Sequence, residues 1–154
     1  MMKGRILHID YNKMKDCLYV SDNRGTLFKL DKELNIIILS NNPLHARGYH
    51  VLKNDGQNII GRDTLGNIVT WHAENLSLQQ FIVSEHLTSN ISIEKNPMPV
   101  PSSAVAEWNS HWLILNACGQ IVELTKECSV VHIYDFNDEA FAECINVETT
   151  PHVV

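Results

Sequence analysis

Histidine and cysteine are the side chains of this sequence best suited to metal chemistry, and their spacing argues against such a role. The eight histidines are His8, His45, His50, His72, His86, His111, His132 and His152. No two of them stand at the i, i+4 spacing of a helical zinc site, and no H-x-H pair occurs. The four cysteines are Cys17, Cys118, Cys128 and Cys144, with no C-x-x-C pair, whereas zinc sites normally contain a close ligand pair. We therefore predict no metal and no cofactor.

The carboxylates offer a hydrolytic alternative, which the sequence supports less well. Asp22 and Asp63 have the chemistry of a general acid and base, but each begins a turn that accounts for it. His8 and Asp10 lie two residues apart on one expected strand and so share a face. No nucleophile elbow, P-loop or dinucleotide-binding glycine pattern is present. We predict that the chain is not an enzyme. The alternative is a hydrolase or ligand-sensing domain with a central site of converging acids or histidines.

Tryptophan, tyrosine and arginine favour recognition of a protein, because these residues carry much of the binding energy of interfaces. Trp108 stands beside a turn at Asn109-Ser110, and Arg24 stands at the tip of another turn. Trp71 and Trp112 are instead expected to fill the cores of sheets. The predicted binding residues are Trp108, Arg24, Tyr49 and His111.

A repeated turn positions these residues. Three glycines share one local pattern, in the segments SDNRGTLFKL (21–30), RDTLGNIVTW (62–71) and LNACGQIVEL (115–124). Asp or Asn stands three residues before each glycine. Such a residue accepts hydrogen bonds from the turn backbone, and the glycine supplies the positive φ that closes a hairpin. Each segment is therefore predicted to be a β-hairpin.

Apolar segments flank each hairpin on both sides, as ILHID (6–10) and LNIIIL (34–39) flank the first. This order predicts four short strands in each of three units, and therefore an all-β fold. We expect a single domain, 1–154. Its parts are a first unit at about 5–41, a second at about 46–84, a proline-containing loop at 85–102, a third unit at about 103–135 and an acidic C-terminal segment at 136–154.

A four-stranded unit with a glycine turn and a closing large apolar residue resembles a β-propeller blade. The segment HVLKNDGQNIIGRDTLGNIVTWH (50–72) is similar to the WD-repeat pattern, with Trp71 at the tryptophan position and His72 where aspartate is usual. The segment LYVSDNRGTLFKLDKELN (18–35) equally resembles pyrroloquinoline-quinone-type blades. The chain departs from the WD pattern just before the turn glycines, where Arg24, Leu65 and Cys118 replace the usual aspartate. The resemblance implies a partial propeller of about three blades. A β-sandwich or barrel of the same strands is the structural alternative.

Three blades are too few for a closed ring, since propellers have about four to eight. An open arc leaves two apolar sheet faces uncovered, which favours aggregation. The ring would be closed by self-association, by a partner chain or by further blades of a longer chain. We therefore expect a non-enzymatic protein–protein interaction module or scaffold, with a protein partner or a homo-oligomer.

The charge distribution excludes some partners. The net charge of −6 argues against general nucleic-acid binding, which needs a basic face. This excess lies in residues 127–154, which contain acidic residues but neither lysine nor arginine. No apolar run approaches the roughly 18 residues of a membrane span, and the first residues lack the pattern of a secretory signal. We expect a cytoplasmic protein that contacts neither nucleic acid nor membrane.

Overall fold

Twelve β-strands, and no helix, form the part of the chain that the computed structural model describes, which is residues 4–41, 48–49, 51–63, 65–82, 105–116 and 119–134. The expected proline-containing loop and acidic C-terminal segment lie outside these residues. The predicted all-β fold of three four-stranded units is confirmed. None of the described residues belongs to a helix that is long and apolar enough to cross a membrane.

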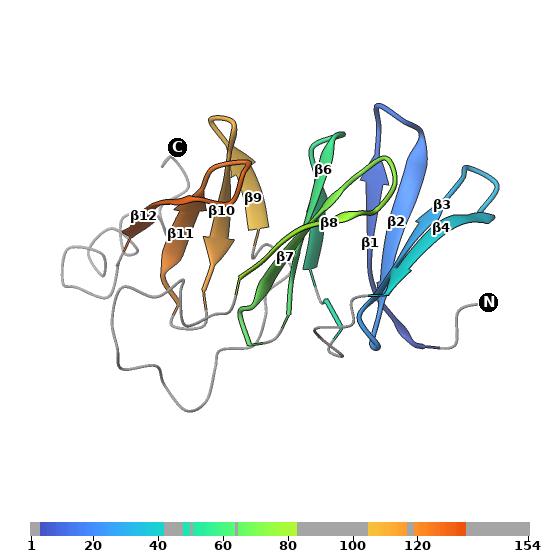
Figure 1. Cartoon of the computed structure of the whole chain (residues 1–154), viewed down its shortest axis with the longest axis horizontal. Coiled ribbons are helices and arrows are strands. Elements are labelled where there is room, and N and C mark those ends of the chain that lie inside the picture. The colour runs from blue at the N-terminus through green and yellow to red at the C-terminus, as the bar shows by residue number, and fades with distance from the viewer. Residues whose placement is uncertain are drawn as a thin grey trace, which may run out of the picture.

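The strands form three antiparallel sheets, and each sheet follows the order of the chain. Sheet 1 contains β1 (Ile6–Asn12), β2 (Cys17–Asp22), β3 (Thr26–Leu30) and β4 (Ile36–Asn41). Sheet 2 contains β5 (Val51–Asn54), β6 (Asn58–Arg62), β7 (Ile68–His72) and β8 (Leu78–Ile82). Sheet 3 contains β9 (Val105–Trp108), β10 (His111–Leu115), β11 (Ile121–Leu124) and β12 (Val130–Tyr134). Figure 1 shows the three sheets standing side by side in chain order.

The second and third strands of each sheet are joined by the predicted glycine turn. Gly25, Gly66 and Gly119 have φ angles of 82°, 88° and 79°, in the left-handed region that favours glycine. In the second turn, Asp63 Oδ1 accepts hydrogen bonds from the backbone N–H groups of Leu65 and Asn67, both at 2.9 Å. This local chemistry gives all three hairpins the same geometry, so positions counted from the turn are equivalent between sheets.

The core lies between the sheets. One apolar cluster joins sheets 1 and 2 through buried residues that include Tyr19, Leu27 and Trp71. A second cluster joins sheets 2 and 3 and includes Ile60 and Trp112. We call the face that packs on the next sheet along the chain the leading face, and the face that packs on the preceding sheet the trailing face. Sheet 1 therefore has a trailing face without a partner sheet among the described residues, and sheet 3 has such a leading face.

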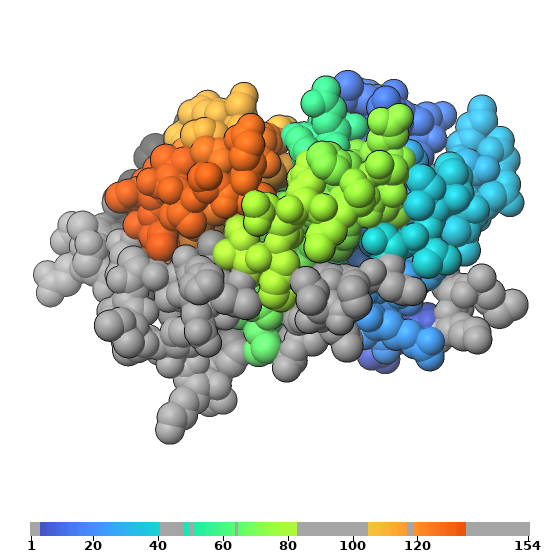
Figure 2. Space-filling model, viewed as in Figure 1, coloured from blue at the N-terminus to red at the C-terminus, as the bar shows by residue number. Residues whose placement is uncertain are grey.

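The first strands of the sheets converge. β5 contacts both β1 and β9, so the three first strands lie next to one another. The fourth strands, β4, β8 and β12, lie side by side on the surface that faces the viewer in Figure 2. The sheets thus radiate from their first strands, as blades do from an axis.

Candidate interaction surfaces

The leading face of sheet 3 is the first candidate surface, because it is only partly covered. Leu113 lies three residues before the turn residue Asn116, at the position of Tyr19 and Ile60 in the other sheets. Tyr19 and Ile60 are each 0% exposed because the next sheet covers them. Leu113 is half-buried, and so is Ile121 on the neighbouring strand. The face thus has the apolar pattern of an inter-sheet surface, and no sheet of the described residues covers it.

Two predicted binding residues lie at this surface. Trp108 is 49% exposed, and His111, which pairs with Trp108 across β9 and β10, is half-buried. His111 Nδ1 lies 2.5 Å from Glu123 Oε2, and the hydroxyl of Tyr134 donates to Glu123 Oε1 at 2.7 Å. The hydrogen bond from Tyr134, with that from His111, holds the pKa of Glu123 below its ordinary value. The lowered pKa keeps the Glu123 carboxylate ionised on the same face as His111.

The trailing face of sheet 1 is the second candidate surface, and it is aliphatic and aromatic. Its centre is a buried cluster of Val20, Phe28 and Leu30 with Leu18 packed against it. By register, Ile9 and Tyr11 of β1 and Leu39 of β4 surround this cluster on the same face, and Ile37 lies at the bulge of β4 two residues before Leu39. These four side chains are between 51% and 55% exposed. An apolar patch of this kind marks an interaction surface.

The other two predicted binding residues lie elsewhere. Arg24 is exposed at the tip of the turn between β2 and β3, and its backbone N–H donates to Asp22 Oδ1 at 3.0 Å. Tyr49 is 0% exposed, and its ring meets the ring of Trp71 edge-on at 5.1 Å between centroids. A side chain that is fully buried between two sheets cannot contact a partner protein, so Tyr49 is a core residue between sheets 1 and 2 and not a binding residue.

Trp71 and Trp112 fill the cores, as expected.

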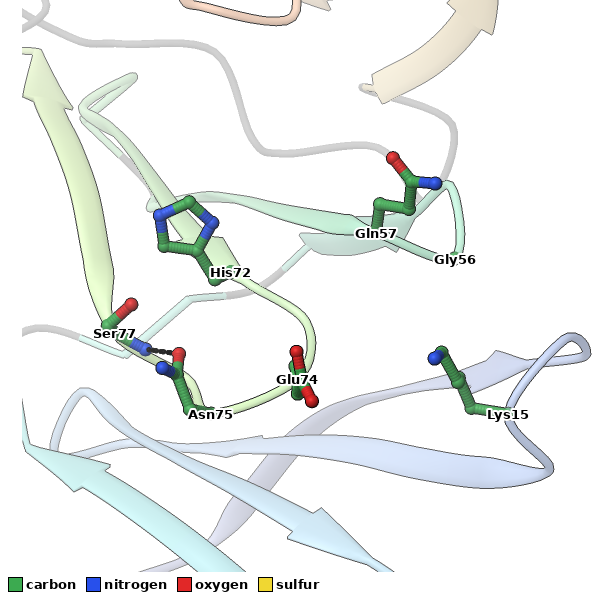
Figure 3. A pocket seen from close by; sticks show the side chains of 7 residues that line it. All are labelled: Lys15, Gly56, Gln57, His72, Glu74, Asn75 and Ser77. Atoms are coloured by element: carbon green, nitrogen blue, oxygen red, sulfur yellow. Dashed lines mark hydrogen bonds between the residues drawn. The ribbon is translucent and has the colours of Figure 1, made fainter.

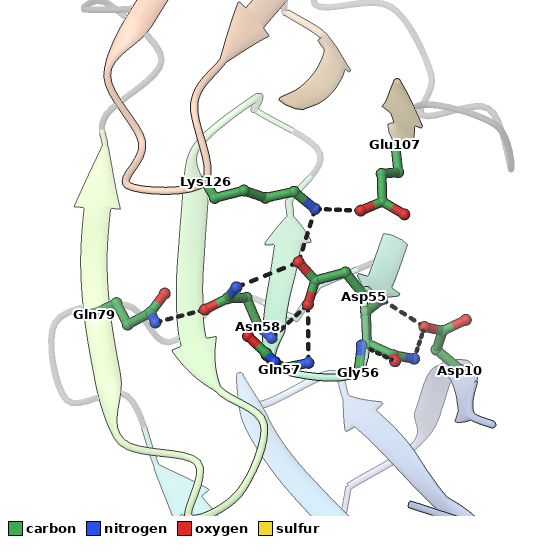
Figure 4. A network of polar contacts seen from close by, with 9 residues as sticks. Asp10, Asp55, Gly56, Gln57, Asn58, Gln79, Glu107 and Lys126 are labelled. Atoms are coloured by element: carbon green, nitrogen blue, oxygen red, sulfur yellow. Dashed lines mark hydrogen bonds and ion pairs between the residues drawn. The ribbon is translucent and has the colours of Figure 1, made fainter. Parts of the chain in front are cut away.

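A polar network joins the sheets near their first strands (Figure 4). Lys126 Nζ lies 2.7 Å from Asp55 Oδ2 in sheet 2 and 2.5 Å from Glu107 Oε2 in sheet 3. The same ammonium lies 3.7 Å from the ring centroid of Trp112. Burial alone would raise the pKa of Asp55, but hydrogen bonds from Lys126 and from two backbone amides outweigh burial and lower it. Lys126 therefore links two sheets through a mostly buried ion pair.

Asp10, one of the two residues of the sequence-predicted polar pair with His8, belongs to this network. Asp10 Oδ2 accepts hydrogen bonds from Asn54 N at 2.7 Å and from Asn54 Nδ2 at 2.5 Å, which ties sheet 1 to sheet 2. Asp10 thus serves an inter-sheet contact. The described residues contain no group of three or more His, Cys, Asp or Glu side chains that could hold a metal ion.

A polar hollow of about 570 Å³ lies between sheets 1 and 2 (Figure 3). Lys15, His72 and Glu74 are among its lining residues. His72 Nδ1 lies 2.8 Å from Gln79 Nε2, and Asn75 accepts a hydrogen bond from the backbone of Ser77. These contacts support the local loops, and the lining side chains do not converge on one point in Figure 3.

Comparison with known proteins identifies the fold. No protein-family model matches the chain, and no curated protein sequence matches it. Among solved structures, BamB from Moraxella catarrhalis superposes with a TM-score of 0.67 at 14% identity, over 84% of this chain and 37% of that one. U3-55K gives a TM-score of 0.63 at 11% identity, over 90% and 42%. The WD40 repeats of RRP9 give 0.64 at 11%, over 90% and 41%.

These similarities define the class of fold. The three sheets are three blades of a β-propeller, as the repeat predicts. The similarity to BamB and to the WD40 repeats of RRP9 agrees with the resemblance of the sequence to β-propeller blades. The chain spans less than half the length of each of these structures.

Sequence reasoning missed Lys126, Asp55 and Glu123. A signal for Lys126 was present, because TKECS (125–129) repeats DKELN (31–35) with the same Lys-Glu pair. The link to Asp55 had no such signal, since the two residues are separated by 71 positions.

Proposed function

We propose that this chain is a non-enzymatic protein–protein interaction module whose three blades are completed by another polypeptide. The observation that carries the proposal is the contrast on the leading faces. Tyr19, Leu27, Ile60 and Ile68 are each 0% exposed under the next sheet, whereas Leu113 and Ile121 at the equivalent positions of sheet 3 are half-buried. A polypeptide that covered sheet 3 would bury the same apolar pattern.

The trailing face of sheet 1 supports the same function from the other end. Ile9, Tyr11, Ile37 and Leu39 stand around an already buried apolar centre, so a covering surface gains apolar contact without desolvating charges. We propose Trp108 and His111 as contacts on the leading face of sheet 3. We also propose Arg24, at its exposed turn, as a contact on the rim of the blades.

The test is to place a charge on one free face. Leu39→Glu puts a carboxylate on the trailing face of sheet 1, and Gln80→Glu puts the same group on the exposed outer strand of sheet 2. Sedimentation velocity measures the mass of the wild type and of both variants, alone and with any co-purified polypeptide. We expect wild type and Gln80→Glu to sediment above the 17.5 kDa of one chain, and Leu39→Glu to lose most of that association.

The opposite result is equally clear. A well-behaved wild-type monomer that binds no polypeptide in a Leu39-dependent way would exclude the proposed function. Circular dichroism of each variant checks that the sheets remain folded. Leu39 is 51% exposed, so its replacement leaves the interior of the sheet intact.

A further inference from the structure

We propose that the polypeptide covering the leading face of sheet 3 is a second copy of this chain, which docks by the trailing face of its sheet 1 and places its Lys32 over Trp108. This inference rests on the proposed function and specifies its partner. Two contacts between neighbouring sheets of the chain support it. The equivalent side chains on the leading face of sheet 3 and on the trailing face of sheet 1 have no neighbouring sheet among the described residues.

The first observation is that the loops after the third strands of sheets 1 and 3 are the same structure. In sheet 1, Asp31 N donates to Asn35 O at 2.9 Å and Leu34 N donates to Asp31 O at 3.0 Å. In sheet 3, the hydrogen bonds from Thr125 N to Ser129 O and from Cys128 N to Thr125 O are both 2.9 Å. The fourth residues, Leu34 and Cys128, have φ angles of 66° and 67°. Lys32 is therefore the structural equivalent of Lys126.

Lys126 shows where a lysine at this position reaches. It extends back to the preceding sheet and meets Asp55, which lies three residues before β6 begins at Asn58. Trp108 lies at the equivalent place in sheet 3, three residues before β10 begins at His111. Lys32 of a docked copy would thus arrive at Trp108 as Lys126 arrives at Asp55. An ammonium over the face of a tryptophan ring is a favourable cation–π contact.

The second observation concerns the position four residues after each turn glycine, which holds Lys29, Thr70 and Glu123. Lys29 Nζ donates to Glu74 O at 2.9 Å, in the loop after the third strand of sheet 2. Cys128 Sγ lies 3.6 Å from Thr70 Oγ1 and belongs to the equivalent loop of sheet 3. Glu123 would face the same loop of the next sheet. In a second copy that loop carries Asp31, Lys32 and Glu33. Lys126 and Thr70, the equivalents of Lys32 and Glu123, line one hollow between sheets 2 and 3, so Glu123 would lie near Lys32.

The two contacts inside the chain also define the direction of docking. Two leading faces placed against each other would bring Glu123 near Glu123, and two trailing faces would bring Lys32 near Lys32. Leading against trailing pairs Glu123 with Lys32 and repeats the arrangement of both contacts inside the chain. A head-to-tail contact closes into a ring when its rotation allows. Two copies supply six blades, which is within the range of about four to eight for closed propellers.

Lys32 and Trp108 are available for this contact. Lys32 is exposed and makes no hydrogen bond or ion pair among the described residues, and Trp108 is 49% exposed. Trp71 and Trp112 are 1% and 0% exposed, so collisional quenching of tryptophan fluorescence reports chiefly on Trp108. This gives a direct probe of the proposed surface in the unmodified chain.

The experiment combines a concentration series with a charge exchange. We expect the wild-type mass to rise from one chain to two with concentration, and acrylamide quenching of Trp108 to fall with it. Lys32→Glu should weaken the dimer by about tenfold or more, because like charges then face each other. Lys53→Glu makes the same change at an exposed position of sheet 2, and should leave the dimer within about twofold of wild type.

Mixing two defective variants tests the pairing itself. Lys32→Glu and Glu123→Lys should each associate poorly alone, whereas their mixture should form dimers. In the mixed dimer one interface keeps the native pair of Glu123 and Lys32, and the other interface pairs the two replaced side chains, which again carry opposite charges. If Glu123→Lys fails to fold by circular dichroism, Trp108→Ala replaces it, and its loss of affinity should not add to that of Lys32→Glu.

Three outcomes overturn the inference. They are a wild-type monomer at all concentrations, a dimer that Lys32→Glu leaves unchanged, and a monomer in which Trp108 is already protected from quenching by its own chain. If a different polypeptide binds in a Leu39-dependent way to such a monomer, the proposed function stands and only the second copy is excluded.

Discussion

Lys126 Nζ lies 2.7 Å from Asp55 Oδ2, and this ion pair joins the loop after β11 to the turn before β6 across two blades. The carboxylate side chain is 12% exposed and the lysine side chain 18% exposed. Asp55 also caps its own turn, since its Oδ1 accepts hydrogen bonds from Gln57 N and Asn58 N at 2.9 Å and 2.6 Å. The contact therefore connects the local shape of one blade to the position of the next.

Removing the ammonium should weaken the packing of blades 2 and 3. Lys126→Met keeps most of the side-chain volume but leaves Asp55 mostly buried without its cation. The expected loss is about 1–3 kcal/mol in the free energy of unfolding, because an ionised buried acceptor loses a partner. Urea denaturation measures it. Lys13→Met, at an exposed turn position, is the matched control and should change the free energy by less than about 0.5 kcal/mol. Equal losses in the two variants would contradict the prediction.

The same pair predicts an acid-dependent stability. The pKa of Asp55 is lowered in the folded chain, so its contribution is present above the ordinary carboxyl pKa of about 4 and is lost as the pH falls through the lowered value. The free energy of unfolding, measured in urea between neutral and acid pH, should therefore fall on acidification. Asp55→Asn should flatten this fall, and Lys126→Met should flatten part of it. A slope unchanged in Asp55→Asn would show that other carboxylates produce it.

Gly61 and Trp71 should behave as a coupled pair. A Cβ atom at Gly61 would lie 3.0 Å and 3.1 Å from two atoms of the Trp71 ring. Gly61→Ala should therefore cost about 1–3 kcal/mol through overpacking. Trp71→Leu alone should cost about 2–4 kcal/mol because it leaves a cavity.

The double variant provides the check on this pair. The positions equivalent to Gly61 and Trp71 hold Val20 and Leu30 in blade 1 and Ile114 and Leu124 in blade 3. Gly61→Ala with Trp71→Leu should accordingly cost less than the sum of the single changes, by about 0.5–3 kcal/mol. Thermal or urea unfolding of all four proteins measures the coupling. Strict additivity would show that the two side chains do not share space.

The turn of blade 2 depends on an acceptor at Asp63. Asp63 is 0% exposed, and its Oδ2 also accepts from Asn67 Nδ2 at 2.8 Å. Asp63→Ala should cost about 1–3 kcal/mol because buried N–H groups lose their acceptor. Asp63→Asn is the control, since Asn116 at the equivalent position accepts from Gln120 N at 2.9 Å. It should retain most of the stability in urea denaturation. If Asn were as harmful as Ala, the carboxylate charge and not the acceptor would matter.

The hairpins were predictable from the residues because their causes are local. An Asp or Asn three residues before a glycine satisfies its own turn, and all three turn glycines adopt the positive φ that this spacing predicts. The apolar segments on either side then specify four strands in each unit. The propeller resemblance followed from that repetition, and the fold agrees with it.

The surfaces depend on contacts between residues far apart in the chain. Tyr49 and Trp108 are both aromatic residues near strand ends, so residue type and position in the sequence predict both as binding residues. Tyr49 is 0% exposed because it packs against Trp71 in the core between blades 1 and 2, whereas Trp108 is 49% exposed because no further blade follows among the described residues. Likewise, Lys32 and Lys126 occupy the same loop position, but among the described residues only Lys126 has a preceding blade to contact. Turn chemistry acts over four or five residues, whereas exposure and ion pairing depend on which sheet packs against which.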